Sequence, residues 1–335
     1  KNELYRSLYR FWVKVFALSF ALGVVSGIVM SYQFGTNWSG YAAFAGSILG
    51  PVIGYEVITA FFLEASFLGV MLFGWNKVGN KVHFFATCMV ALGTVISTFW
   101  ILVANSWMQT PAGHEIVDGR AIPVDWLEVI FNPSFPYRFG HAVVGAYLTT
   151  AFAIAGLSAW MMLRGRSNVA VKTSFSLALW FATVFVPIQI FLGDQQGLNV
   201  RDHQPAKLAA MEGHWRNEPG ESVPLILFGI PDAEAEETRY ALEIPHLSSL
   251  IITHSWDGTF PGLAEFPADE RPPVFLTFWM FRIMVAIGLA MLVVAGISLW
   301  LRWKGRLHDT RWFHLVCFAM LPSGFVAVTT GWFPA

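Results

Sequence analysis

Charged residues are scarce in this chain. Asp, Glu, Lys and Arg make up 13% of its 335 residues, against roughly a quarter in an ordinary soluble domain. The formal net charge of −1 gives no basic field for binding nucleic acid. The two cysteines, Cys88 and Cys317, both lie in apolar stretches and provide neither a disulfide framework nor a metal cluster. These shortages exclude a soluble globular enzyme, a disordered chain and a nucleic-acid-binding protein.

Apolar residues are abundant instead. They make up 55% of the chain, which contains 30 Phe and 15 Trp and has a mean hydropathy of +0.54. A helix that crosses a bilayer needs about 20 mostly apolar residues. Seven stretches meet this condition, and none is typical of a cleavable signal peptide: 11–31, 51–73, 82–103, 134–163, 171–192, 274–300 and 312–332. We therefore predict an all-α fold, a polytopic transmembrane helical bundle with a long external loop.

The distribution of Lys and Arg predicts the orientation of the spans. Thirteen basic residues lie on the side of the N-terminus, with only Glu3 and Asp309 against them. The other side has seven basic and eighteen acidic residues. Because cytoplasmic loops are enriched in Lys and Arg, we expect a cytoplasmic N-terminus and three external segments: 32–50, 104–133 and 193–273.

Three regions follow from this layout. Residues 1–192 would hold five helices, 193–273 an external loop, and 274–335 two further helices. Connections as long as the central loop are usually either functional or disordered. Its apolar and aromatic residues among Pro, Gly and acidic residues predict a partly ordered lid on the membrane surface.

Carboxylates inside the predicted spans are costly, and each is a candidate functional residue. Glu56 and Glu64 share one span, at a rise of about 12 Å along a helix. They are expected nearly on one face, where they could relay protons or approach a cofactor. Ser97 in the next span could extend this path. Alternatively, each carboxylate caps a neighbouring helix or pairs with a partner subunit.

A histidine and a methionine are expected in the outer halves of two spans. His141 and Met284 provide a nitrogen and a sulfur, a known axial pair for haem iron. Arg282 adds a cation suited to a haem propionate. From these residues alone, a packing histidine and a core methionine are the favoured interpretation.

Nine short stretches occur in one order along almost the whole chain, and this set resembles subunit I of the cytochrome bd quinol oxidases. They are QFGTNWS at 33–39, AFFLE at 60–64, WILVAN at 100–105, WMQ at 107–109, GD at 193–194, KLAAME at 207–212, LFGIP at 227–231, FRIM at 281–284 and GWF at 331–333.

The resemblance implies a respiratory terminal oxidase of the bacterial inner membrane. Such an enzyme oxidises ubiquinol or menaquinol at the outer, periplasmic face and reduces dioxygen to water. Its cofactors are a low-spin haem b, a high-spin haem b and a haem d or further haem b. Its partners are a second membrane subunit, subunit II, and in some members a small single-span accessory subunit.

The resemblance also implies roles for individual residues. His141 and Met284 match the axial ligands of the low-spin haem, and Arg282 the arginine beside it. Lys207 and Glu212 match the pair implicated in quinol oxidation, and their spacing is expected to put them near one another on a helical turn. The remaining matches are to the membrane carboxylates near the high-spin haems, a hydroxyl on the proton route and a tryptophan among the haems: Glu56, Glu64, Ser97 and Trp332.

The chain departs from the family pattern in several places. The family has nine helices, and its first carries a haem-ligating histidine that would precede Lys1. A haem-ligating Glu and a Gly-Arg-x-Pro-Trp motif would follow Ala335. We therefore expect a fragment, truncated at both ends, that does not reduce dioxygen alone. Ala65 stands where some members have Ser, and the loop resembles the short type, which includes cyanide-insensitive oxidases.

Two other functions are compatible with the same spans. A proton-coupled transporter would also have buried carboxylates, although no inverted repeat or pair of broken helices is evident. A non-catalytic subunit that carries haem for electron transfer or assembly is the second alternative.

Overall fold

The computed structural model describes residues 2–218 and 220–334. The chain is mostly helical with two small two-stranded sheets, and it divides into two compact units, Lys1–Phe139 and Gly140–Ala335. Among the described residues, seven helical segments are long and apolar enough to cross a membrane. The predicted fold class and number of spans are therefore confirmed.

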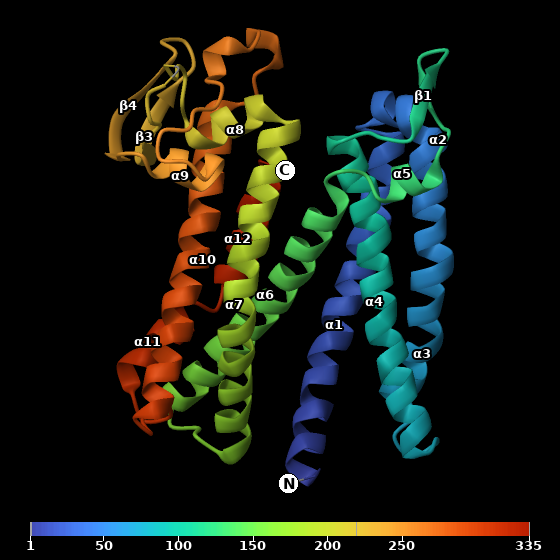
Figure 1. Ribbon diagram of the computed structural model, residues 1–335. Coiled ribbons are helices and arrows are strands. Elements are labelled where there is room, and N and C mark those ends of the chain that lie inside the picture. Colours follow the sequence, from blue (N-terminus) through green and yellow to red (C-terminus); the bar gives the residue numbers. More distant parts are fainter. Residues whose placement is uncertain (1, 219, 335) are drawn as a thin grey trace. The chain divides into compact units, whose positions relative to one another are not determined.

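The first unit is a bundle of long helices, and one of its connections forms a small two-stranded sheet (Figure 1). Its elements are α1 (Asn2–Gly35), α2 (Ser39–Glu56), the π-helical turn η1 (Val57–Phe61), α3 (Phe62–Phe73), α4 (Asn80–Gln109), β1 (His114–Val117), β2 (Arg120–Pro123) and α5 (Trp126–Ile130). The second predicted span is thus one long helix with a wide π turn in its middle.

A buried polar network fixes the outer end of α4 to the start of α6 (Phe135–Leu163). The Asn132 amide donates to Ser106 Oγ at 2.8 Å, and the Thr110 hydroxyl lies 2.6 Å from that of Ser134. All four side chains are at least nine-tenths buried. Because an unsatisfied buried polar group costs about 1–3 kcal/mol, these reciprocal hydrogen bonds favour one arrangement of the two helix ends.

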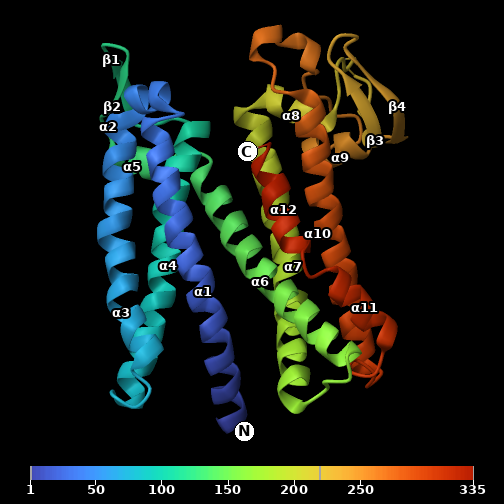
Figure 2. The same cartoon turned by 180° about the vertical axis from the view of Figure 1, so that it is seen from behind.

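The second unit contains the rest of α6 and the external segment. Its further elements are α7 (Val169–His203), α8 (Pro205–Glu212), β3 (Leu225–Asp232), β4 (Glu237–Ile244), α9 (Leu247–Thr253), the 3₁₀ turns η2 (Leu263–Glu265) and η3 (Ala268–Glu270), α10 (Val274–Trp303), α11 (Arg311–Ala319) and α12 (Ser323–Trp332). Figure 2 shows α10 from the opposite side, again with the β3–β4 hairpin and α9 beside its outer end.

The last predicted span, 312–332, is interrupted rather than continuous. It consists of α11 and α12, and Pro322 lies between them. Proline lacks the N–H that would continue the helix. Close packing keeps α12 against α6, because a Cβ on Gly324 would lie 2.4 Å from Thr149 Cα.

Helical structure continues beyond the predicted span 171–192. Helix α7 continues to His203, so residues 193–203, expected in the loop, are helical. Val200 packs with Leu208 and Ile252, and Arg201 Nη1 donates to the Ile252 carbonyl at 2.7 Å. These contacts with α8 and α9 stabilise an extension whose composition is not typical of a membrane span.

Candidate functional site

Helix α8 places a carboxylate in the interior of the segment that connects α7 to α10. The helix begins with Pro205 and is capped by Gly213, whose left-handed φ of 77° is favourable for glycine. Glu212, its last residue, is only 5% exposed. The hydroxyl of Ser248, on α9, donates to Glu212 Oε2 at 2.7 Å. The carboxylate is thus enclosed and held by one side-chain donor.

Arg282 connects α10 to the same place. Its Nη2 donates to the Glu212 carbonyl at 3.1 Å, its Nη1 to the Met211 carbonyl, and its Nε to the Ile226 carbonyl at 2.7 Å. The guanidinium carbon lies 3.6 Å from the centre of the Phe278 ring. One arginine thereby ties α8 and β3 to α10 and brings a positive charge close to the carboxyl.

Burial determines the protonation of this cluster. It raises the pKa of Glu212, while the charge of Arg282 and the hydrogen bond from Ser248 oppose that rise. Burial also lowers the pKa of His214 to about 4, although the hydrogen bond to the Pro224 carbonyl opposes that shift. Near neutral pH, His214 is therefore uncharged, and Glu212 is the group suited to exchange a proton.

Lys207 lies beside an open pocket at the start of α8. Its Nζ donates to Gln204 Oε1 at 2.8 Å. The pocket has a volume of about 360 Å³, and its lining combines apolar, amide, basic and acidic groups: Gln204, Pro205, Ala206, Lys207, Phe266, Glu270 and Pro272. Residues five apart on a helix differ by roughly 140° around its axis. Lys207 and Glu212 are therefore not neighbours on one helical turn, as their spacing was expected to make them: Lys207 lines the pocket and Glu212 is buried.

The predicted histidine ligand lies between α6 and α7. The Gln189 amide nitrogen is 3.2 Å from both ring nitrogens of His141. A Cβ on Gly193 would lie 3.2 Å from His141 Cε1. The Gln189 amide nitrogen can hydrogen-bond with only one ring nitrogen at a time, so the other ring nitrogen of His141 could bind a metal.

The predicted methionine ligand lies between α10 and α12. A Cβ on Gly331 would be 2.7 Å from Met284 Sδ, so only glycine fits there without a shift of the thioether. Trp332, the next residue, is 65% exposed. The structure thus places Met284 against Gly331, the residue before Trp332, while His141 is held separately by Gln189 of α7.

The membrane carboxylates of the first unit face the same side of α4. Ser97 Oγ donates to Glu56 Oε1 at 2.7 Å. One turn earlier on α4, a Cβ on Gly93 would be 2.4 Å from Glu64 Cγ. Glu64 is buried, and its Oε1 accepts no hydrogen bond from the part of the chain that the structure describes. The expected grouping of Glu56, Glu64 and Ser97 is therefore present.

Three neighbours of these residues were not predicted from the sequence. Gln189 is a polar residue in an apolar span and could have been singled out on that ground. Ser248 and His214 lie in the external segment, where polar residues are ordinary. Only the fold reveals that Ser248 contacts a carboxylate 36 residues away.

Comparison with known proteins gives one consistent family. The sequence profile described as cytochrome bd terminal oxidase subunit I matches residues 1–335. Cytochrome bd ubiquinol oxidase subunit 1 of Bacillus subtilis is 36% identical and aligns with 99% of this chain and 73% of its own length. Cytochrome bd-II ubiquinol oxidase subunit 1 of Escherichia coli is 34% identical and aligns with 99% of this chain and 77% of its own length. The bd oxidase structure from Geobacillus thermodenitrificans matches with a TM-score of 0.90 at 32% identity, over 99% of this chain and 76% of that one.

Proposed function

The chain belongs to the cytochrome bd terminal oxidase subunit I family, and we propose that Glu212 and Lys207 form its quinol-oxidising site. Membership makes it a haem-binding subunit of a quinol:oxygen oxidoreductase, a multi-pass protein of the bacterial inner membrane. In the overall reaction, two quinols and one dioxygen give two quinones and two waters. The proton-coupled transporter finds no support in these relatives.

The burial of Glu212 carries the proposal for the quinol site. Oxidation of one quinol releases two electrons and two protons, so the site needs a proton acceptor. Glu212 can take one proton, because its carboxylate is enclosed and only partly stabilised by Ser248 and Arg282. Lys207 would hold a quinol oxygen in the pocket at the start of α8, where Phe266 offers an aromatic surface, and Glu212 lies at the other end of the same helix. The quinol would be ubiquinol or menaquinol.

His141 and Met284 are the residues that we propose as axial ligands of the low-spin haem b. Imidazole nitrogen and thioether sulfur are the donor chemistry that this group requires. The shared Gln189 amide leaves His141 able to provide a nitrogen, and Gly331 leaves room for the thioether of Met284. Bound haem would supply one-electron transfer. Arg282 would add positive charge on the same helix as Met284, and Trp332 would add an aromatic ring on α12.

Glu56, Glu64 and Ser97 are proposed to move protons within the membrane. Ser97 Oγ donates a hydrogen bond to Glu56. Glu64 has a buried oxygen that could accept a proton or a hydrogen bond from water. We place the N-terminus in the cytoplasm from the distribution of Lys and Arg. Protons released outside and taken up from the cytoplasm would then build a membrane potential without a pump.

The further cofactors and partners follow the family. We propose a high-spin haem b, a haem d or further haem b, and a subunit II. A small accessory single-span subunit would complete the assembly in some members.

Haem spectroscopy of the assembled oxidase tests the ligand assignment. We expect His141→Ala and Met284→Leu to abolish or strongly shift the low-spin haem b band in dithionite-reduced minus oxidised spectra. The matched controls, His308→Ala and Met291→Leu, should leave the band in place, because these residues have other neighbours in the second unit. An unchanged low-spin spectrum in both ligand variants would contradict the proposal.

A further inference from the structure

The base of the β3–β4 hairpin and helix α9 together present an unusual outer surface. Helix α9 buries its serines, since Ser248 and Ser249 are fully enclosed, and exposes Leu250 and Ile251 at 42% and 44%. The exposed apolar residues of this surface, which we name the apolar base, are Leu227, Phe228, Leu242, Ile244, Leu250 and Ile251. The usual arrangement of a surface helix in water is reversed here.

Contacts with α10 fix the depth of the apolar base. The Ile226 carbonyl, at the beginning of β3, accepts a hydrogen bond from Arg282. Two residues later, the Phe228 ring lies edge-on against Trp279, with centroids 5.1 Å apart. Arg282 follows Val274, the first residue of α10, by eight positions, or about 12 Å along the helix axis. The beginning of the hairpin therefore lies well along the membrane helix.

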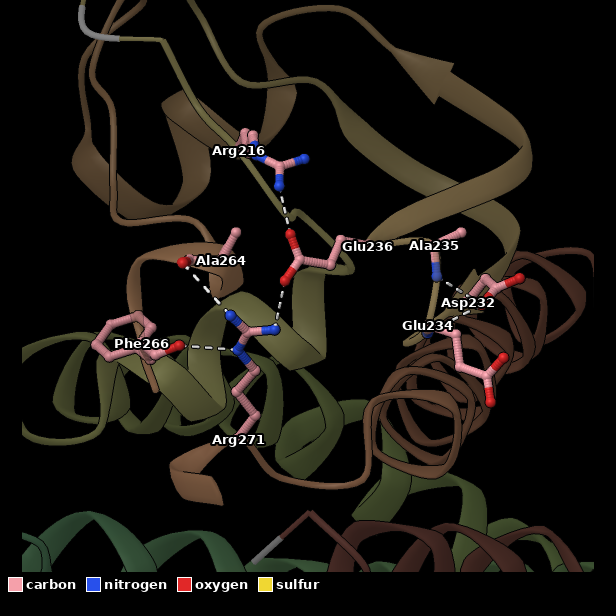
Figure 3. A network of polar contacts seen from close by, with 8 residues as sticks. All are labelled: Arg216, Asp232, Glu234, Ala235, Glu236, Ala264, Phe266 and Arg271. Atoms are coloured by element: carbon pink, nitrogen blue, oxygen red, sulfur yellow. Dashed lines mark hydrogen bonds and ion pairs between the residues drawn. The ribbon is translucent and has the colours of Figure 1, made fainter. Parts of the chain in front are cut away.

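The opposite end of the hairpin lies beyond the start of α10. Glu236, in the hairpin turn, accepts hydrogen bonds from Arg216 and, at 2.8 Å, from Arg271 Nη1 (Figure 3). Arg271 in turn donates to the carbonyls of Phe266 and Ala264. The hairpin thus runs along the outer part of α10, with its turn outward and its apolar base toward the membrane.

The length of α10 locates the bilayer boundary. Arg282 and Arg302 are twenty residues apart, or about 30 Å in a helix, which equals the thickness of a hydrocarbon core. With Arg302 at the cytoplasmic boundary, Arg282 lies near the outer edge of the core. Trp279 then falls at the level where tryptophans are enriched at membrane interfaces.

Charge changes along the hairpin in the same direction. The turn carries Asp232, Glu234, Glu236 and Glu237. In residues 225–228 and 241–252, by contrast, Glu243 is the only acidic residue and there is no Lys or Arg. This gradient is suited to a segment with one end in water and the other in contact with lipid.

We propose that the apolar base lies in the outer leaflet of the bilayer, at the boundary between headgroups and acyl chains. The partner is the lipid itself, which covers Leu250 and Ile251 on the outer side of α9. The inner side of the same helix carries Ser248, the donor to Glu212. Lipid contact would therefore help to seat the helix that holds the carboxylate. The placement depends on α10 crossing the membrane and is independent of the quinol assignment.

Site-directed spin labelling of the assembled oxidase in lipid nanodiscs tests this placement. A nitroxide attached to the cysteine of the Ile251→Cys variant should collide often with dissolved oxygen, which partitions into lipid. It should collide rarely with a nickel chelate, which stays in water. The matched control is Glu234→Cys, on the exposed hairpin turn, where the preference should be reversed. The oxidase without an introduced cysteine, treated with the same label, corrects for labelling of Cys88 and Cys317.

Two outcomes would overturn the proposal. Free access of the nickel chelate to the label at Ile251→Cys would place this surface in water. Protection from both oxygen and nickel would show that a protein surface covers it. Leu242→Cys, on β4, provides a second label position should Ile251→Cys fail to assemble, and the same outcomes apply to it.

Discussion

Replacing Ser248 with alanine should change the pH dependence of quinol oxidation. The Ser248 hydroxyl donates its proton to Glu212 Oε2 at 2.7 Å and therefore favours the ionised carboxylate. Burial already raises the pKa of Glu212, and the substitution removes one of the two influences that oppose the rise. The pKa should therefore increase further, and the acidic limb of the kcat/KM profile should move to higher pH.

The size of the effect follows from the type of hydrogen bond. A hydrogen bond to a charged group contributes about 1.5–3 kcal/mol. Its loss would reduce the ionised fraction of Glu212, on the acidic limb, roughly ten- to hundredfold. At pH values well above the pKa the carboxylate is ionised in both proteins, and the rates should converge. His214 should not obscure this limb, because its pKa of about 4 lies well below neutrality.

The assay is steady-state quinol oxidation by the assembled oxidase in detergent or nanodiscs, over about pH 5 to 9. Ser249→Ala is the matched control, because Ser249 is equally buried but accepts its hydrogen bond from the Val223 backbone N–H at 2.7 Å. An acidic limb that stays in place with Ser248→Ala, or moves as far with Ser249→Ala, would refute this reasoning.

Two further predictions concern the membrane helices. Gly331→Ala introduces a Cβ at 2.7 Å from Met284 Sδ, so the thioether must move; redox titration of the low-spin haem should show a changed midpoint potential or a weakened band. Ser97→Ala removes the hydrogen bond to Glu56; dioxygen uptake should slow roughly tenfold, while stopped-flow reduction of the low-spin haem by quinol should keep its rate.

Each of these has a control on a helix that packs against the one carrying the substitution. Gly288→Ala, on α10, adds a Cβ with open space around it and should leave the haem titration unchanged. Ser66→Ala removes a hydroxyl that donates to the Phe62 carbonyl of its own helix, and it should leave uptake unchanged. Equal effects in variant and control would mean that general disturbance of the helices explains the result.

The sequence predicts the spans because each is a long apolar run, and hydropathy measures just that. It does not predict the interruption of the last span, since Pro322 sits in an apolar stretch and changes hydrogen bonding rather than hydropathy. It also misplaces the end of α7, where helix 193–203 depends on contacts such as Arg201 with the Ile252 carbonyl.

The candidate site residues also divide into those that the sequence itself indicates and those that it does not. Glu56 and Glu64 are recognisable because carboxylates are rare in apolar helices. Ser97 lies in the next span, where it could extend their path, and its hydrogen bond to Glu56 agrees with that prediction. Glu212 and Lys207, by contrast, were found only through resemblance to a family, because acidic and basic residues are ordinary in an external segment. The burial of Glu212 and its contact with Ser248 are products of the tertiary fold.

The π turn at Val57–Phe61 works as a phase correction between the two membrane carboxylates. The expectation that both lie nearly on one face does not hold for a regular α-helix, because eight residues rotate by about 800° and would leave Glu64 about 80° out of phase with Glu56. With roughly 4.4 residues per turn across the five residues of the π turn, the rotation falls to about 710°, close to two full turns. Both carboxylates then point at the one face of α4 that carries Gly93 and Ser97. The π turn thereby keeps the two carboxylates aligned although they are eight residues apart.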